Sequence, residues 1–131
     1  NTKNDIKVIY GSRVLNRKKE KRSFAVNFRI FANFVLTTIS NIFNNQKLTD
    51  AHTCYKFMQS RVIKDLDLSH SDFSICPEIT TKLSRLKYDI IEIPISYVGR
   101  TYSEGKKIRF KDAIIALLTL IKFRFFWYKK N

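Results

Sequence analysis

A short strand-like sequence near the start of the chain ends in side chains that could bind a phosphate. IKVIYGSR (6–13) reads as a buried strand that ends at Gly11, which places Gly11, Ser12 and Arg13 at its carboxyl end. Ligands of open α/β sheets bind beyond that edge of the sheet. An arginine there can hold a phosphate through two parallel hydrogen bonds. The structural alternative is a turn arginine lying on the protein surface.

Two acids in the middle of the chain could take part in chemistry. Asp50 lies in LTDAHTCYKFM (48–58), and Glu78 follows Pro77 at the start of a helical pattern. A carboxylate beside cationic groups stays ionised and can serve a hydroxyl or phosphate as a base. Each acid also has a structural alternative. Asp50 could cap the segment that follows it, and Glu78 could be a first-turn acid favoured by the helix dipole.

A second candidate anion site lies in EGKKIRFKD (104–112). Gly105 would let the backbone approach an anion closely, while Lys106 and Lys107 supply positive charge and Arg100 could converge on the same group. The sequence is not a Walker loop, because the upstream glycine and the Lys-Ser/Thr pair are missing. A solvated basic loop is the structural alternative.

The histidines and cysteines do not form a metal-binding pattern. His52 and His70 have no third ligand at a suitable spacing, so a surface or capping role is expected for both. Cys54 and Cys76 lie outside any CxxC motif, which predicts free thiols in a reducing compartment.

The charge of the chain lies mainly at its two ends. The 131 residues carry a formal net charge of +14, with 25 basic and 11 acidic residues. Residues 1–30 and 99–131 each hold nine basic and two acidic residues, whereas residues 31–98 are neutral overall. This distribution predicts an anionic partner such as phosphates, nucleic acid or an acidic membrane surface. The chain also begins without methionine and almost at once enters a strand, so we expect a fragment of a longer protein.

The elements that must position these residues alternate between strands and helices, which indicates an α/β fold with a mixed sheet and flanking helices. A helix is expected over 24–43, with an apolar face that should be buried on two sides or lie against lipid. Its members are Phe24, Phe28, Phe31, Val35, Ile39 and Ile42. A helix begins near Pro77, and 89–98 reads as a strand in which Pro94 indicates an edge position.

The last segment, 112–131, has the composition of an amphipathic helix. Its uninterrupted apolar run covers only 113–121, whereas a helix that spans a bilayer needs about 20 apolar residues. Aromatic and basic residues alternate after that run, as they do in helices at a membrane interface. A helix packed on the domain is equally compatible with this pattern.

Five sequences taken in order resemble the C-terminal half of family 2 glycosyltransferases of the dolichyl- or polyprenyl-phosphate sugar synthase type. They are VIYGSR, LTDAHTCYKFM, F-x-x-x-PEITTKL from Phe73, IIEIPISYVGRT and EGKKIRFKDAIIALLTLIKFRF. The resemblance covers 6 to about 125 and implies a partial GT-A (nucleotide-diphospho-sugar transferase) fold that lacks its N-terminal half. Residues 1–111 would then belong to the catalytic domain, and 112–131 would form a membrane-interfacial helix.

The resemblance also implies roles for individual residues. Asp50 matches an acid of the sugar site and is the candidate catalytic residue, as a base or as a contact to the sugar or the acceptor. The basic loop 17–22 and the helix 24–43 match the region that meets the lipid phosphate and the bilayer. The implied substrate-binding residues are Ser12, Arg13, Arg22, Thr49, Glu78, Arg100, Lys106 and Lys107.

The implied activity is transfer of a sugar from a nucleotide sugar to a polyprenyl or dolichyl phosphate. It would take place on the cytoplasmic face of a membrane, with the protein peripheral or anchored through other segments. Mg²⁺ or Mn²⁺ is implied for the full-length protein, but no Asp-x-Asp lies at a strand end here, so its ligands are expected outside this chain. The fragment alone is expected to be inactive.

A non-catalytic basic module that binds nucleic acid or an anionic membrane is the alternative function. The net charge and the aromatic residues among the basic residues of 122–130 favour it. Against nucleic acid, the chain has no RNP, KH or helix-turn-helix signature, and most aromatic residues fall at helical spacing. Nucleic acid is therefore not expected as a partner.

Overall fold

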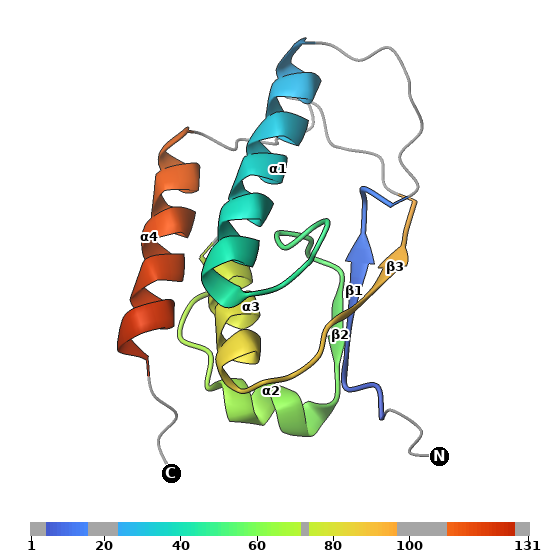
Figure 1. The fold of residues 1–131 in the computed structure, drawn as a ribbon, viewed down its shortest axis with the longest axis vertical. Helices are drawn as coiled ribbons and strands as arrows, with labels where there is room; N and C mark the ends of the chain where they lie inside the picture. The colour runs from blue at the N-terminus through green and yellow to red at the C-terminus, as the bar shows by residue number, and fades with distance from the viewer. Residues whose placement is uncertain (1–4, 16–23, 72–73, 97–109, 128–131) are drawn as a thin grey trace.

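The computed structural model describes residues 5–15, 24–71, 74–96 and 110–127, and within them the predicted α/β class is confirmed (Figure 1). Three strands form one sheet in the order β2-β1-β3, accompanied by helices α1 to α4. In chain order the elements are β1 (Val8–Ser12), α1 (Phe24–Asn44), β2 (Lys56–Met58), α2 (Ser60–Leu66), α3 (Ile75–Arg85), β3 (Ile91–Pro94) and α4 (Phe110–Phe126).

The sheet is mixed, as the sequence predicts. β1 lies in the centre, antiparallel to β2 and parallel to β3. Pro94 therefore lies in an edge strand, where its missing N–H costs no internal ladder bond. Gly11 lies within β1 and does not end it. The lack of a side chain at Gly11 lets the strand pass very close to Tyr55 and Ile95. A Cβ on Gly11 would meet a side-chain carbon of each at 2.9 Å.

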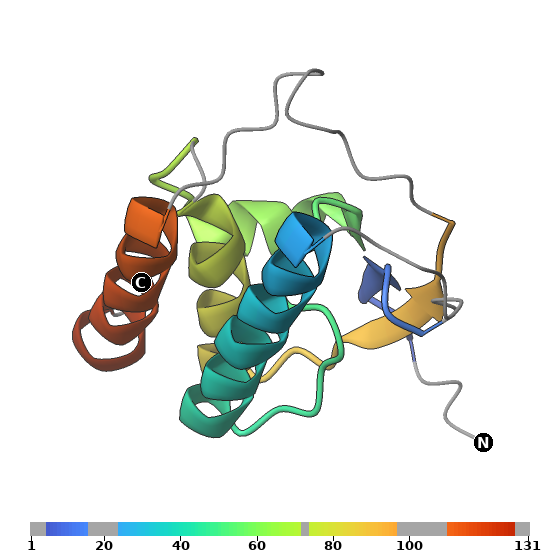
Figure 2. The ribbon, with the colours of Figure 1, turned by 90° about the horizontal axis from the view of Figure 1, so that it is seen from above.

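The hydrophobic core lies between the sheet and the helices, which are stacked on one side of it with α4 farthest away (Figure 2). Val8 and Tyr10 alternate with the outward residues of β1 and point into this core. The Tyr10 hydroxyl also forms a hydrogen bond of 3.0 Å with Thr80 Oγ1 of α3. The remaining buried hydrophobic residues of the core are Leu48, Ala51, Val62, Leu66, Ile79 and Leu83.

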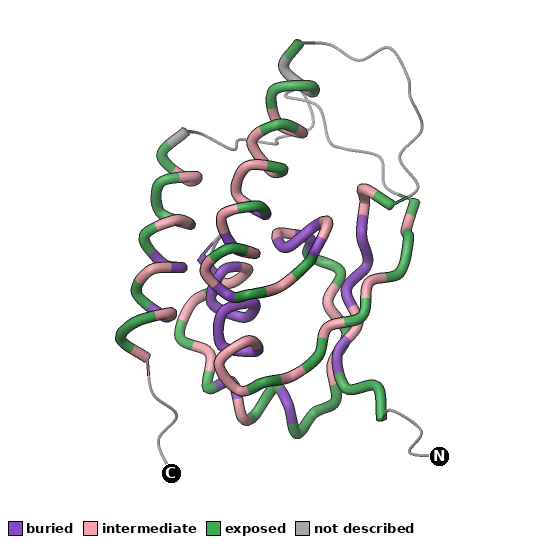
Figure 3. The backbone as a smooth tube through the Cα atoms, viewed as in Figure 1, coloured by how far each residue is buried: buried purple, intermediate pink, exposed green. Residues whose placement is uncertain are grey.

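Helix α1 turns its polar face inward and much of its apolar face outward (Figure 3). Phe24 is 85% exposed and Ile42 is 74% exposed, while Thr37, Ser40 and Asn44 are buried. Burial on two sides, one of the two expectations for this helix, is therefore wrong among the described residues. Contact of the apolar face with lipid stays a prediction. We call the exposed residues Phe24, Phe28, Phe31, Phe34 and Ile42 the outer stripe of α1.

The inward polar face has a physical reason, because it holds a segment without regular structure. Residues 47–55 follow α1 and need partners for their buried backbone groups. The Asn41 side chain donates to Leu48 O at 2.8 Å and accepts from Leu48 N at 3.0 Å. Thr37 Oγ1 accepts a hydrogen bond from Ala51 N at 3.3 Å. Helix α1 thus fixes the segment that carries Asp50.

Helix α4 packs on α3 and begins two residues before the predicted boundary at 112. Ala116, Leu120 and Phe123 are buried, so one face of the helix belongs to the packed domain. The opposite face is exposed and carries Ile114, Ile115, Leu118, Phe125 and Phe126. A membrane-interfacial role for this face stays a prediction.

Two leucines provide a matched test of this packing. Leu83→Ala should lower the free energy of unfolding by about 2–5 kcal/mol, because it leaves a cavity in the core. Leu118→Ala removes the same atoms from an exposed position on α4 and should change the stability by no more than about 0.5 kcal/mol. Urea unfolding followed by circular dichroism measures both. Equal losses would show that α3 or α4 is packed differently.

Candidate functional site

The carboxyl end of β1 carries a buried ion pair with a two-pronged geometry. Arg13 Nε donates to Asp50 Oδ2 at 2.7 Å, and Arg13 Nη2 donates to Asp50 Oδ1 at 2.9 Å. The backbone N–H of Arg13 also donates to Oδ2, at 3.1 Å. The Asp50 side chain is fully buried, whereas 19% of the Arg13 side chain is exposed. Asp50 therefore fixes the orientation of the guanidinium, while part of the Arg13 side chain stays in contact with solvent.

The surroundings of Asp50 keep its carboxylate ionised and supply hydrogen-bond donors to both of its oxygens. Burial alone would raise its pKa, but the hydrogen bonds and charge of Arg13, helped by Asn33, outweigh burial and lower the pKa. Asn33 Nδ2 of α1 donates to Oδ1 at 3.3 Å. A carboxylate with a lowered pKa and donors on both oxygens is a weak proton acceptor. The geometry thus favours a positioning role for Asp50, which holds Arg13, over a role as a general base.

Glu92 of β3 is a further residue of this cluster, and the sequence analysis did not single it out. Its carboxylate accepts from Thr49 N at 2.8 and 3.0 Å, from Thr49 Oγ1 at 2.8 Å and from Asp50 N at 3.0 Å. The sequence did contain a signal for Glu92, namely the alternation of side chains along β3. Ile91 and Ile93 share one face and point outward, so Glu92 between them must point inward.

Ser12 and Thr49 complete the cluster. Ser12 Oγ and Thr49 Oγ1 lie 2.6 Å apart, and Ser12 Oγ also accepts from Val14 N at 3.2 Å. The structure therefore brings together four of the predicted site residues, from two motifs 37 residues apart. We call the set Ser12, Arg13, Asn33, Thr49, Asp50 and Glu92 the Asp50 cluster.

A cavity of about 270 Å³ borders the Asp50 cluster and shares two residues with it, Asn33 and Thr49. Helix α1 supplies most of the wall, and apolar side chains dominate it. The lining residues are Val14, Asn27, Ile30, Phe31, Asn33, Phe34 and Thr49. A ligand in this cavity would place an apolar group against α1 and a polar end toward the cluster.

Glu78 lies in a different group of interactions. Its carboxylate accepts from Lys82 Nζ at 2.7 Å and Ser69 N at 2.8 Å, and it lies 2.7 Å from His70 Nδ1. Lys82 Nζ lies 4.7 Å from the ring centre of Phe123, so this group faces α4. Burial would raise the pKa of Glu78, but Lys82, Ser69 and His70 together lower it. The hydrogen bonds described here for Glu78 go to Ser69, His70 and Lys82 and not to the Asp50 cluster, and its substrate role stays a prediction.

Four predicted substrate-binding residues lie outside the described residues. They are Arg22, Arg100, Lys106 and Lys107, and the basic loop 17–22 lies there too. Their predicted roles toward the lipid phosphate and the donor phosphates stay predictions.

His52 follows the cluster and is half-buried, whereas the sequence predicts a surface or capping role. Its Nε2 atom is buried and has no hydrogen-bond partner among the described residues. Burial and the nearby charge of Lys56 lower the pKa of His52 to about 4, so the ring is neutral near pH 7. Lys56 is itself turned inward, where its Nζ donates to Ala51 O at 3.2 Å and lies 4.5 Å from the Tyr10 ring centre.

Replacement of Asp50 tests the ion pair. Asp50→Asn should lower the free energy of unfolding at pH 7 by about 2–4 kcal/mol, because Arg13 then loses a buried counter-charge. The folded pKa of Asp50 is below its ordinary value, so its contribution is full above about pH 4 and is lost as the pH falls further. The difference between the native chain and the variant should therefore narrow in acid.

Urea unfolding at several pH values measures this difference. Asp67→Asn is the matched control, since Asp67 is exposed and has a left-handed backbone that asparagine tolerates. A constant difference between the native chain and Asp50→Asn from pH 7 to pH 2 would contradict the ion pair.

Comparisons with protein-family models, curated proteins and solved structures found no match. Within the described ranges, no group of three or more His, Cys, Asp or Glu side chains is arranged to hold a metal ion. The described helices also include none with the length and hydrophobicity needed to cross a membrane.

Proposed function

We propose that the chain is the acceptor-binding part of a sugar transferase of the GT-A type. Its substrate would be a polyprenyl or dolichyl phosphate at a membrane surface, and its donor a nucleotide sugar. The observation that carries the proposal is that Asn33, which donates a hydrogen bond to Asp50 of the Arg13–Asp50 pair, also lines a cavity with a largely apolar wall. A lipid phosphate needs such a combination, a fixed cation for its head and an apolar surface for its chain.

Arg13 is the group proposed to bind the acceptor phosphate. Asp50 accepts hydrogen bonds from two of its nitrogens, and 19% of the Arg13 side chain is exposed. A guanidinium held in this way binds phosphate with little further loss of side-chain freedom. Because the last proton of a phosphate monoester has a pKa of about 6, the acceptor is already ionised near neutral pH. The transfer therefore needs no general base. This agrees with the geometry of Asp50, because both of its carboxylate oxygens already accept hydrogen bonds.

The outer stripe of α1 supports the location at a membrane. Phe24, Phe28 and Phe31 follow one exposed face of the helix, and that helix also lines the cavity. An apolar helix face at a bilayer surface gains free energy by leaving water, at roughly 25 cal/mol per Å² buried. The same helix could thus lie on the bilayer and admit the chain of the lipid phosphate from it.

The outer face of the sheet supports the proposal that more of a GT-A fold packs here. Phe57, Ile91 and Ile93 are exposed on that face, opposite the helices. Strands of α/β sheets that are covered on both faces are apolar on both faces. The nucleotide sugar and the Mg²⁺ or Mn²⁺ ion would be held chiefly by that additional part, with Arg100, Lys106 and Lys107 closing on the donor phosphates.

Farnesyl phosphate is a short lipid phosphate that tests the acceptor site. Arg13→Lys keeps the charge but loses the two-pronged geometry, so it should weaken binding about tenfold or more. Arg61→Lys makes the same change on the exposed surface of α2 and should leave the affinity unchanged. Titration calorimetry measures both, with circular dichroism to establish that each variant is folded.

One further ligand and one further variant distinguish the phosphate-binding part of the site from its apolar part. Farnesol lacks the phosphate and should bind much more weakly, and Phe34→Ala should reduce the affinity for farnesyl phosphate through the apolar wall. Equal binding of farnesyl phosphate to the native chain and to Arg13→Lys would overturn the proposal. Binding to anionic phospholipid vesicles without any effect of farnesyl phosphate would instead favour the non-catalytic membrane module.

A further inference from the structure

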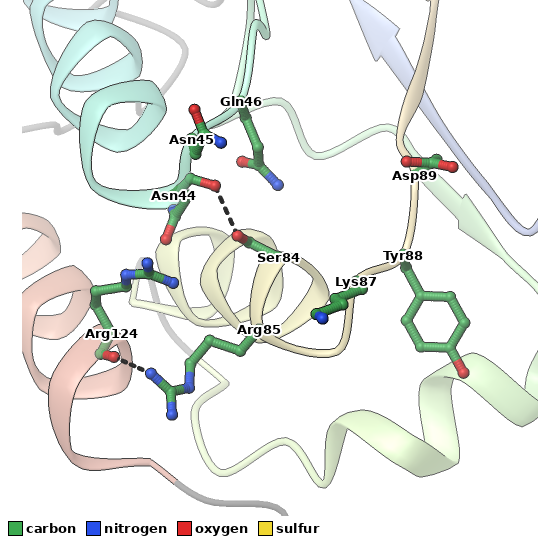
Figure 4. A pocket seen from close by; sticks show the side chains of 9 residues that line it. All are labelled: Asn44, Asn45, Gln46, Ser84, Arg85, Lys87, Tyr88, Asp89 and Arg124. Carbon is green, nitrogen blue, oxygen red and sulfur yellow. Dashed lines mark hydrogen bonds between the residues drawn. The ribbon is translucent and has the colours of Figure 1, made fainter.

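A second pocket, of about 440 Å³, lies where α1, α3 and α4 end (Figure 4). The pocket lies at the C-terminal end of α1, whereas Phe24 is at the N-terminal end of that helix. None of its lining residues belongs to the Asp50 cluster. The lining residues are Asn44, Asn45, Gln46, Ser84, Arg85, Lys87, Tyr88, Asp89 and Arg124.

The charged side chains of the pocket are mainly basic. Arg85, Lys87 and Arg124 line it together with a single acid, Asp89. Part of this positive charge has a structural purpose, because three helix carboxyl ends meet here and carry partial negative charge. Arg85 Nη1, for example, donates to Arg124 O in the last turn of α4. Helix stabilisation therefore accounts for some of the basic residues. A test of ligand binding must distinguish the two roles.

Two amide oxygens in the same pocket are not accounted for by helix stabilisation. Asn44 Oδ1 and Gln46 Oε1 are buried and have no hydrogen-bond partner among the described residues. The orientation of the Asn44 amide is fixed, because its Nδ2 contacts Ser40 Oγ at 3.2 Å and Thr81 Oγ1 at 3.3 Å. A buried acceptor without a donor costs about 1–3 kcal/mol. A ligand with hydroxyl groups would supply the missing donors.

The pocket thus offers cations for an anion and acceptors for hydroxyl groups. We propose that it binds a phosphate ester that carries free hydroxyl groups. The phosphate would lie against Lys87 and Arg124, and the hydroxyl groups would donate to Asn44 Oδ1 and Gln46 Oε1. Sugar phosphates and the headgroups of hydroxylated anionic phospholipids share this chemistry. The site is independent of the acceptor site at Arg13, so each proposal can fail without the other.

The neighbourhood of the pocket makes both sources of the phosphate ester possible. Exposed apolar residues lie on the last turns of α1 and α4, among them Ile42 and Phe126. The rings of Phe43 and Phe125 form an edge-to-face pair with centres 6.1 Å apart, which joins the two helices there. A headgroup in the pocket would therefore have apolar surface beside it, whereas a soluble ester would need only the polar lining.

Three small probes and one vesicle test the proposal with the 131-residue chain. Glycerol 3-phosphate carries a phosphate and two hydroxyl groups, methyl phosphate carries no hydroxyl group, and inorganic phosphate is the bare anion. Vesicles of phosphatidylglycerol in phosphatidylcholine present the same chemistry on a membrane. The side-chain amide signals of Asn44 and Gln46 in ¹⁵N NMR spectra report binding at the pocket itself.

Two variants and one control accompany the probes. Lys87→Asn removes a charge and suits the left-handed backbone of that position (φ 60°). Lys64→Asn, the control, makes the same change at an exposed position of α2. Gln46→Leu removes an unpaired buried oxygen. It should leave the unliganded chain as stable as before or more stable, so any loss of binding is not caused by unfolding.

Glycerol 3-phosphate should shift both amide signals and bind about tenfold more tightly than methyl phosphate or inorganic phosphate. Lys87→Asn and Gln46→Leu should each weaken it about tenfold, and Lys64→Asn should not. Shifts that arise only with phosphatidylglycerol vesicles, with the same variant pattern, would identify the lipid headgroup as the source. Equal affinity for the three small probes, or shifts from none of the probes and vesicles, would overturn the proposal and leave helix stabilisation as the role of the basic residues.

Discussion

The ion pair between Arg13 and Asp50 is the interaction on which the candidate site depends. It joins the end of β1 to the irregular segment after α1. Glu92 then holds the backbone of that segment from β3, and Asn33 reaches it from α1. Because Asp50 is fully buried and its partners are half-buried polar groups, loss of one member leaves the others with unsatisfied hydrogen bonds. The guanidinium orientation is therefore a property of the whole cluster.

The cluster also accounts for the unusual orientation of α1. Polar side chains at Asn33, Thr37 and Asn41 satisfy the segment that carries Asp50, so the helix must turn this face inward. The phenylalanines on the other side are then left at the surface, where a soluble helix would ordinarily carry polar residues. The proposed bilayer surface would resolve this conflict, since it would accept the apolar face while the polar face builds the site. Fold, site and proposed location thus follow from one helix.

The sequence predicted the parts of the fold that depend on local patterns. β1, α1, α3 and the edge position of Pro94 could be read from periodicity and from the properties of proline. The face of α1 that turns inward could not be read in this way, because the inward positions of Asn33 and Thr37 depend on hydrogen bonds to Asp50 and Ala51, which follow the helix. Glu92 was missed for the same reason, since its partners at Thr49 and Asp50 come from another segment. Arg13 and Asp50 were both predicted, but their direct pairing is a long-range contact that spacing does not reveal.

The most direct test of the account is to map where the chain of a lipid phosphate lies. A farnesyl phosphate analogue with a photoreactive diazirine at the end of its chain can be bound, irradiated and located by mass spectrometry. The account predicts adducts on the wall of the cavity, at Ile30, Phe31 or Phe34, and their loss in Arg13→Lys. Adducts on the exposed sheet face around Phe57, or adducts on α1 that persist in Arg13→Lys, would contradict a phosphate site at the Asp50 cluster.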